Sequence, residues 1–132
     1  ALPAAEPAPL HRDLHDKQVL VDPHGGVGLL DFDTLATGDP ALDVGNLLAH
    51  LDLRALQGRC TPDDAGRAAA AFLAGYEAGA DLEERAAVFA AATRVRLACV
   101  YALRPAWRHL GEALLPAAVP GAWRLVGMPG SG

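Results

Sequence analysis

Residues 11–18 read His11-Arg12-Asp13-Leu14-His15-Asp16-Lys17-Gln18, and an acidic triplet, Asp31-Phe32-Asp33, begins thirteen residues after Gln18. Between these polar stretches, residues 19–30 form two short apolar runs around a Gly-Gly turn, which predicts a β-hairpin. Such a hairpin would hold Gln18 at one end and Asp31 directly across from it. The sequence therefore predicts that the two polar stretches lie side by side.

The residues after the second stretch predict a helix. Residues 34–38 are expected to form a loop, and Asp39-Pro40 suits an N-cap followed by a proline at the first helical position. Apolar residues then recur at helical spacing, so the helix is expected over residues 40–57. The N-cap and the apolar spacing together predict that a helical region begins near Pro40.

Three further helices are expected. One is predicted over residues 61–78 and a longer one over 81–104, where Asp81 and Glu84 resemble a capping box. A short helix is expected over 107–115. The fold class that follows is mainly α with one small β-hairpin.

Length, charge and composition exclude several classes of function. The chain of 132 residues suits one domain, and its net charge of −5 comes with arginines spread at helical spacing, which predicts solvated faces and no nucleic-acid partner. No run approaches the roughly 18 apolar residues of a membrane span. Cys60 and Cys99 are isolated, which predicts free thiols. We therefore expect a cytoplasmic protein without a membrane partner.

The residue types around the hairpin leave three interpretations open. Asp31 and the Gln18 side-chain oxygen suit magnesium, with Asp13 free to act as a base. His11 and His15 with a carboxylate suit zinc or manganese instead. The third interpretation is a polar network that fixes the loops without any chemistry.

A resemblance to a known family favours the first interpretation. The sequence His11-Arg12-Asp13 with a carboxamide five residues after the aspartate, then Asp31-Phe32-Asp33, Gly38-Asp39-Pro40 and Asp43, resembles the catalytic lobe of the aminoglycoside phosphotransferase and choline kinase-like family. This family shares its phosphotransfer layout with the protein kinases. The resemblance is close from residue 11 to about residue 51 and implies the C-terminal, large lobe of a kinase-like fold.

The resemblance also implies roles for individual residues. Asp13 would accept the proton of the substrate hydroxyl or orient that hydroxyl, and Asp31 would bind magnesium at the nucleotide phosphates. Gln18 stands where the family usually has asparagine, so its amide oxygen would reach one magnesium, and Asp33 would be a further metal ligand. The implied cofactor is Mg²⁺ with ATP.

Three other residues are expected to support this site. His11 is expected to pack under the loop and to hydrogen-bond the backbone. His15 is expected to stabilise the loop or to contact phosphate or substrate. Asp43 resembles the helix aspartate of the family that accepts backbone N–H groups from the catalytic loop.

Kinase-like phosphotransfer also needs a nucleotide lobe, and no residue of this chain matches one. We therefore expect residues 1–10 to be a lead-in from a missing N-terminal lobe, residues 11–126 to be the C-terminal lobe and residues 127–132 to be a tail. Such a fragment is expected to be inactive alone. The face that the N-terminal lobe would cover is then expected to be apolar and exposed, so that two copies of the fragment could pair through it as a homodimer.

The parent protein is expected to phosphorylate a hydroxyl of a small molecule, with aminoglycosides, amino alcohols and sugars all open as acceptors. Trp107, Trp123 and Tyr101 are expected in the core, with an acceptor pocket as the other possibility. Two alternatives remain, namely a metal-dependent hydrolase that uses His11, His15, Asp13 and Asp31, and a degenerate, non-catalytic kinase-like binding module.

Overall fold

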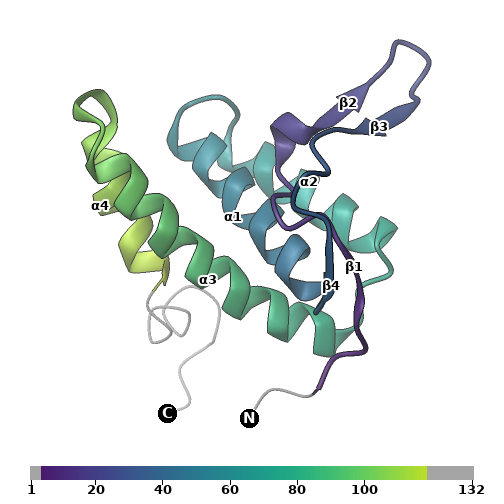
Figure 1. The fold of residues 1–132 in the computed structure, drawn as a ribbon. Coiled ribbons are helices and arrows are strands. Elements are labelled where there is room, and N and C mark those ends of the chain that lie inside the picture. The colour runs from purple at the N-terminus through teal and green to yellow at the C-terminus, as the bar shows by residue number, and fades with distance from the viewer. Residues whose placement is uncertain (1–3, 119–132) are drawn as a thin grey trace, which may run out of the picture.

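The computed structural model describes residues 4–118 and consists of helices with two small antiparallel sheets (Figure 1). The helices are α1 (Ala41–Leu56), α2 (Pro62–Gly75), α3 (Ala80–Ala102) and α4 (Arg108–Ala118). Two single 3-10 turns, η1 (Asp16–Gln18) and η2 (Pro105–Trp107), precede β2 and α4. The expected mainly helical fold class is confirmed; Trp123 and the expected tail over 127–132 lie outside the described residues.

The predicted hairpin is present and projects from the helical body (Figure 1). Its strands β2 (Val19–Val21) and β3 (Val27–Leu29) pair with Val19 opposite Leu29. Asp22 shapes the turn because its Oδ1 atom accepts the backbone N–H groups of His24 and Gly26 at 2.7 and 2.8 Å. Gly25 has a φ angle of 85°, which favours glycine.

A second sheet corrects two expectations from the sequence. Strand β1 (Ala8–Leu10) pairs with β4 (Ala36–Gly38), so residues 34–38 are not simply a loop and residues 8–10 are more than a lead-in. Alanine, proline and glycine have low strand propensity, which is why neither segment was predicted as a strand. The pairing buries Leu10 beneath the site.

The core lies between α3 and its two neighbours, α1 and α4. One cluster of buried residues joins these three helices, and a second joins the start of α1 to α3. The first contains Ala49, Leu53, Ala90, Leu97, Ala98, Leu110 and Leu114. The second contains Ala41, Val44 and Ala86. Many of these residues are small, so the helices approach closely.

Buried arginines on α3 depart from the expected solvated faces. Arg85 donates to Asp39 at 3.0 Å, and Arg94 donates through Nε to Asp52 at 3.1 Å. Both arginines are buried. A buried guanidinium needs a carboxylate partner, and here these partners lie on or just before α1. The ion pairs therefore fix how α3 lies against α1.

The helix ends differ in detail from the prediction. Thr61 and Asp64 form the capping box at the start of α2. Asp81 does not cap α3, because the helix begins one residue earlier, at Ala80, and Asp81 lies inside its first turn. Cys60 and Cys99 are free thiols, as predicted. Among the described helices, none is long and apolar enough to cross a membrane.

Candidate active site

The loop between β1 and β2 is clamped by α1. Asp43, in the first turn of α1, accepts the backbone N–H of His11 at 2.6 Å and that of Arg12 at 2.8 Å. One turn later, Asn46 donates from Nδ2 to the carbonyl of Leu14 at 2.8 Å. Three backbone groups of the loop are thus bound to one helix, so the loop holds a defined conformation.

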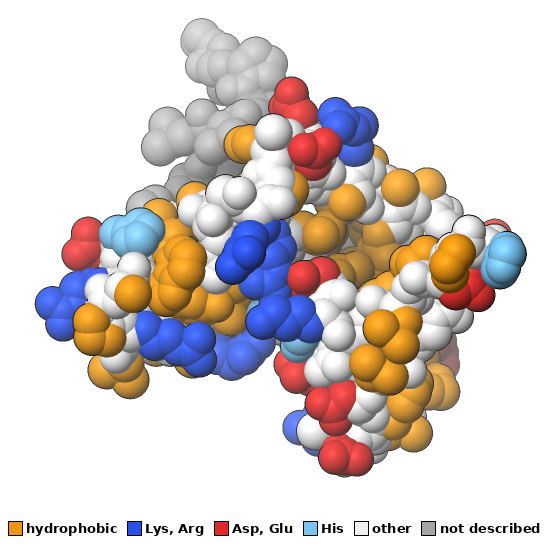
Figure 2. Space-filling model, turned by 90° about the horizontal axis from the view of Figure 1, so that it is seen from above, with side chains coloured by type: hydrophobic (Ala, Val, Ile, Leu, Met, Phe, Trp, Pro, Cys, Tyr) orange, Lys and Arg blue, Asp and Glu red, His pale blue; other side chains and the backbone are white. Residues whose placement is uncertain are grey.

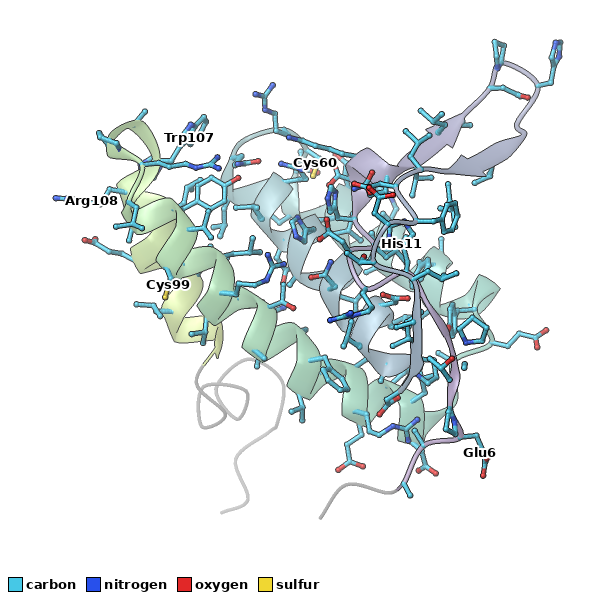
Figure 3. All side chains as sticks on the ribbon, in the orientation of Figure 1. Glu6, His11, Cys60, Cys99, Trp107 and Arg108 are labelled. Atoms are coloured by element: carbon cyan, nitrogen blue, oxygen red, sulfur yellow. The ribbon has the colours of Figure 1, made fainter. Side chains whose placement is uncertain are left out.

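The same loop is also tied to the strands. The His11 side chain is buried, and its Nε2 atom lies 2.6 Å from the carbonyl oxygen of Leu30. Thr34 donates from Oγ1 to the His11 carbonyl at 2.8 Å. Figure 3 shows His11 between the base of the hairpin and α1. Both ring nitrogens of His11 face backbone groups, since the Asp13 N–H lies 3.4 Å from Nδ1.

Arg12 adopts a backbone conformation that usually favours glycine, with a φ angle of 69°. The two hydrogen bonds that this segment donates to the Asp43 carboxylate offset the strain of that conformation. The chain bends at Arg12 and Asp13. As a result, the Asp13 side chain faces outward on a rigid loop.

Asp13 is an accessible carboxylate. About half of its side chain is exposed, at 45%, while that of His15 is only 14% exposed. The Nε2 atom of His15 lies 3.6 Å from Asp13 Oδ2, so a charged His15 would stabilise the carboxylate. A carboxylate that is rigidly held and open to solvent can accept a proton from a substrate hydroxyl.

Gln18 and Asp31 lie next to each other across the base of the hairpin. Gln18 donates from Nε2 to Asp31 Oδ2 at 3.2 Å, and the Leu30 N–H donates to the Gln18 carbonyl at 2.9 Å. Asp31 has a φ angle of 62°, a strained conformation of the kind found at functional sites. One carboxylate and one amide oxygen are hard donors that suit Mg²⁺. The residue types and their placement therefore fit this ion.

Asp33 lies close by in sequence, and its side chain is exposed. Within residues 4–118 it makes no side-chain hydrogen bond or ion pair. The structure therefore brings Gln18 and Asp31 together, and it shows no contact of Asp33 with either of them within residues 4–118.

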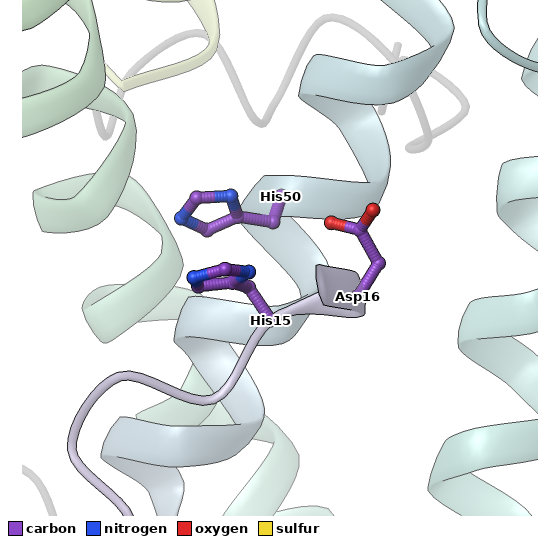
Figure 4. Close-up of side chains that lie close together, drawn as sticks. All are labelled: His15, Asp16 and His50. Atoms are coloured by element: carbon purple, nitrogen blue, oxygen red, sulfur yellow. The ribbon is translucent and has the colours of Figure 1, made fainter. Parts of the chain in front are cut away.

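A different group of side chains, His15, Asp16 and His50, offers ligand atoms within 4.8 Å of one another (Figure 4). The rings of His15 and His50 are stacked, with centroids 4.7 Å apart and an angle of 22° between planes. A zinc ion bonds nitrogen at about 2.1 Å, so ligand atoms must converge to within roughly 4.2 Å of one another. Nearly parallel rings direct their lone pairs side by side, which does not form such a site.

The hydrolase alternative needs His11 and His15 as ligands of one metal. His11 is committed to the backbone at both nitrogens, and the cluster that could hold a metal in the described part of the chain does not include it. This geometry favours oxygen donors at the hairpin over a histidine site. His15 stacks on His50, and no local pattern in the sequence predicts this pair.

Burial, together with the nearby positive charges of His15, Arg96 and Arg54, lowers the pKa of His50 to about 4. The unfolded histidine titrates near 6.5, so between pH 6.5 and 4 the unfolded chain binds a proton that the folded chain does not. The free energy of unfolding should therefore fall as the pH drops through this window, by about 2 kcal/mol. Urea unfolding at pH 7 and pH 4.5 measures this loss.

The matched variants for this prediction are His50→Gln and His24→Gln. His50→Gln removes the titrating group and should flatten the pH dependence, whereas His24, exposed at the hairpin turn, should not affect it. An unchanged pH dependence in His50→Gln would show that other groups cause the loss.

Hard oxygen donors at the base of the hairpin and an accessible carboxylate on the preceding loop are the groups that phosphoryl transfer needs, so these residues indicate a phosphotransferase. The comparison with protein families agrees. Residues 1–89 match the phosphotransferase enzyme family (APH), and the chain belongs to this family. The resemblance indicated by the motif is confirmed, and the match ends within α3. Comparison with curated proteins and with solved structures gives no significant match.

Proposed function

We propose that this chain forms the C-terminal lobe of an ATP- and Mg²⁺-dependent phosphotransferase that acts on a hydroxyl group of a small molecule. The observation that carries the proposal is the placement of Gln18 and Asp31 in contact at the base of the hairpin, on the continuation of the clamped loop that presents Asp13. Membership of the phosphotransferase family supports it.

The proposed reaction assigns Asp13 the role of base. The acceptor oxygen forms a bond to the γ-phosphorus of ATP, and the bond from that phosphorus to the bridging oxygen breaks. ADP leaves with the bonding electrons, and the hydroxyl proton passes to the Asp13 carboxylate. Because phosphoryl transfer depends mostly on positioning and charge, the rigid loop contributes by holding Asp13 in line with the acceptor.

In this proposal Asp31 and the Gln18 amide oxygen hold Mg²⁺, and exposed Asp33 supplies a further ligand. When bound, the ion neutralises charge on the phosphates. Gln18 is held toward Asp31 by the contact between their side chains. The hairpin fixes the backbone of Gln18, and its amide nitrogen faces Asp31; in this proposal the amide turns to present its oxygen to the ion, in the role that an asparagine usually has.

The exposed hairpin supports a further lobe upstream of this chain. Apolar side chains on and beside β2 and β3 are largely open to solvent; they are Leu20, Val21, Val27, Leu29, Leu30, Phe32 and Leu35. A continuous apolar surface of this kind marks a contact with another protein surface. We propose that the nucleotide lobe covers it, and that without this lobe a second copy of the chain would pair there and the chain would be inactive.

The proposal is tested with the intact protein, upstream sequence included, in an assay of ATP consumption against a panel of hydroxyl compounds. We expect Mg²⁺-dependent phosphorylation of at least one compound. Asp31→Asn should raise the Mg²⁺ concentration needed for half-maximal rate by about tenfold or more, because one anionic ligand is lost. Asp81→Asn, on α3 and exposed, is the matched control and should leave it unchanged.

Absence of any ATP-dependent transfer, with the protein folded and ATP bound, would instead favour the non-catalytic binding module. A hydrolytic activity that requires zinc or manganese and that is lost in His15→Ala would favour the hydrolase.

A further inference from the structure

A positively charged cleft of about 470 Å³ lies next to the clamped loop. Its walls come from η1, the C-terminal end of α1 with the following loop, and the turn from α3 to η2. Its cationic side chains are Lys17, Arg54, Arg59 and Arg104. Figure 2 shows Lys and Arg side chains gathered on this upper face, around a hollow near its centre. Four of the eleven Lys and Arg residues of an acidic chain thus line one cleft.

Most of this charge is not neutralised by the protein. Asp16 is the one carboxylate that lines the cleft, and it pairs with Arg54 at 2.8 Å. Within residues 4–118, Lys17, Arg59 and Arg104 have no carboxylate partner, and residues 119–132 contain no Asp or Glu. The cleft therefore carries three more positive than negative charges.

The cleft is also ordered on its inner side. Arg54 donates from Nη1 to Gln57 Oε1 at 2.7 Å, and Gln57 donates in turn to the Tyr101 hydroxyl at 3.1 Å. The Arg104 guanidinium lies over the Tyr101 ring, 5.2 Å from its centroid. Trp107 lies at the turn between α3 and α4 (Figure 3). These contacts hold aromatic faces and guanidinium groups in fixed positions around the opening.

The charge extends to the surface around Asp13. A second hollow of about 480 Å³ contains Asp13, and its cationic residues are Arg12 and Arg96. Arg96 donates to Asn46 Oδ1 at 3.0 Å, a neutral acceptor that leaves its charge uncompensated. Asp13 thus lines a hollow in which two cations face its one carboxylate.

The wall of the first cleft begins close to Asp13 along the loop. Asp16, in the wall of the first, is three residues from Asp13, so their Cα atoms are at most about 11 Å apart. A compound that places its hydroxyl at Asp13 can therefore place a second group among the cations of the first cleft.

We propose that the acceptor of this enzyme is a hydroxyl compound that carries an anionic group, a carboxylate or a phosphate, which binds to Lys17, Arg59 and Arg104. The inference rests on the proposed function for the identity of the reaction, but the charge of the ligand follows from the cleft alone. Guanidinium groups bind carboxylate and phosphate oxygens in pairs, and positive charge in a cleft concentrates anions. A polycationic aminoglycoside or an amino alcohol is repelled by the same residues.

The first experiment measures binding without ATP, using NMR titration of the intact protein with two matched probes. Glycerol 3-phosphate and 3-amino-1,2-propanediol both carry a diol and differ in the sign of the charged group. We expect the phosphate to shift the signals of Lys17 and of the Tyr101 and Trp107 rings, and the amine to leave them unchanged. Equal binding of both probes, or no binding of the phosphate, would overturn the proposal.

A charge-removal series locates the binding. The double variant Lys17→Gln with Arg59→Gln should weaken glycerol 3-phosphate binding about tenfold or more, since two charged hydrogen-bond donors are lost. Arg67→Gln removes a charge from exposed α2 and should have no effect. Full displacement of glycerol 3-phosphate by ATP would assign the cleft to the nucleotide and overturn the proposal.

The second experiment compares acidic, neutral and basic hydroxyl compounds as acceptors. Transfer to acids, with KM for the acceptor raised in the double variant and KM for ATP unchanged, is the expected result. If only hydroxyl compounds with an amino group are phosphorylated, the proposal of an anionic acceptor is wrong, whereas the proposed phosphotransferase function is supported. If the protein binds the anion but transfers phosphate to no acceptor, the cleft remains an anion-binding site and the proposed function is contradicted.

Discussion

Replacing Asp13 with asparagine is expected to lower kcat for phosphoryl transfer by a factor of about 10² to 10⁴, the usual contribution of a positioned base. Asparagine keeps the size of the side chain and can still accept a hydrogen bond, but it cannot take up the hydroxyl proton. The KM for ATP should change little, because the proposed nucleotide contacts are at Gln18 and Asp31. Steady-state assays of the intact protein give both constants.

The structure makes this variant easy to interpret. Asp13 is half exposed, and its side chain contacts only His15 among the described residues, at 3.6 Å. The loop is held by Asp43 and Asn46, so its conformation does not depend on the Asp13 carboxylate. The stability of Asp13→Asn should therefore equal that of the wild type.

A matched control is Asp63→Asn, which makes the same chemical change at an exposed position in the first turn of α2. It should leave kcat unchanged. A rate for Asp13→Asn within a factor of about two of the wild type would remove Asp13 as the base, since a missing base has a far larger effect. His15, whose Nε2 atom lies 3.6 Å from Asp13, would then be the next candidate for the base.

The sequence predicts those parts of the site whose residues are brought together by one local element. The two apolar runs around a turn predict the hairpin over residues 19–30. Its register places Gln18 opposite Leu30, so Asp31 lies one residue beyond the position directly across from Gln18 that the sequence predicts. The stacked His15 and His50 could not be predicted in the same way. They are 35 residues apart, and only the docking of the loop on α1 brings them together.

The arginines show why the rest was missed. Periodicity treats arginine as a solvent-facing residue, yet Arg85 and Arg94 are buried because Asp39 and Asp52 lie within reach on the neighbouring segment. The Lys and Arg residues that line the positively charged cleft are likewise far apart in the sequence, from Lys17 to Arg104. Their convergence depends on how α3 crosses α1, which is a property of packing and not of any local pattern.

The strand pair β1 and β4 was missed for another reason. Its members are rich in residues with low strand propensity, so tertiary contacts decide their conformation. Leu10 is buried by this pairing, directly before the loop that carries the site. The pairing therefore anchors the chain on the N-terminal side of the loop.

The packing of α1 against α3 leads to the second large effect, which is expected at Gly45. A Cβ atom at this position would lie 2.5 Å from the Ala86 carbonyl oxygen and 2.7 Å from both the Ala90 nitrogen and the Phe89 Cβ. Two of these atoms belong to the backbone of α3, so the helices must move apart. Gly45→Ala should lower the free energy of unfolding by about 2 to 3 kcal/mol, as overpacked cores do.

The matched control is Gly66→Ala in α2, where a Cβ atom would meet nothing within 4 Å. There the better helix propensity of alanine should raise stability by about 0.5 to 1 kcal/mol. Urea unfolding of the two variants separates packing from propensity, because both replace a helical glycine with alanine. Equal stability of the two would contradict the close approach of α1 to α3.

Gly45 also lies between the residues that hold the site, since Asp43 binds the backbone of His11 and Arg12 and Asn46 binds that of Leu14. A shift of α1 at Gly45 moves both clamps, so Gly45→Ala should reduce transfer even at temperatures where the variant remains folded. If the folded variant kept full activity, the loop would not depend on α1 for its conformation. The same close helix contact therefore determines the stability of the fold and the position of Asp13.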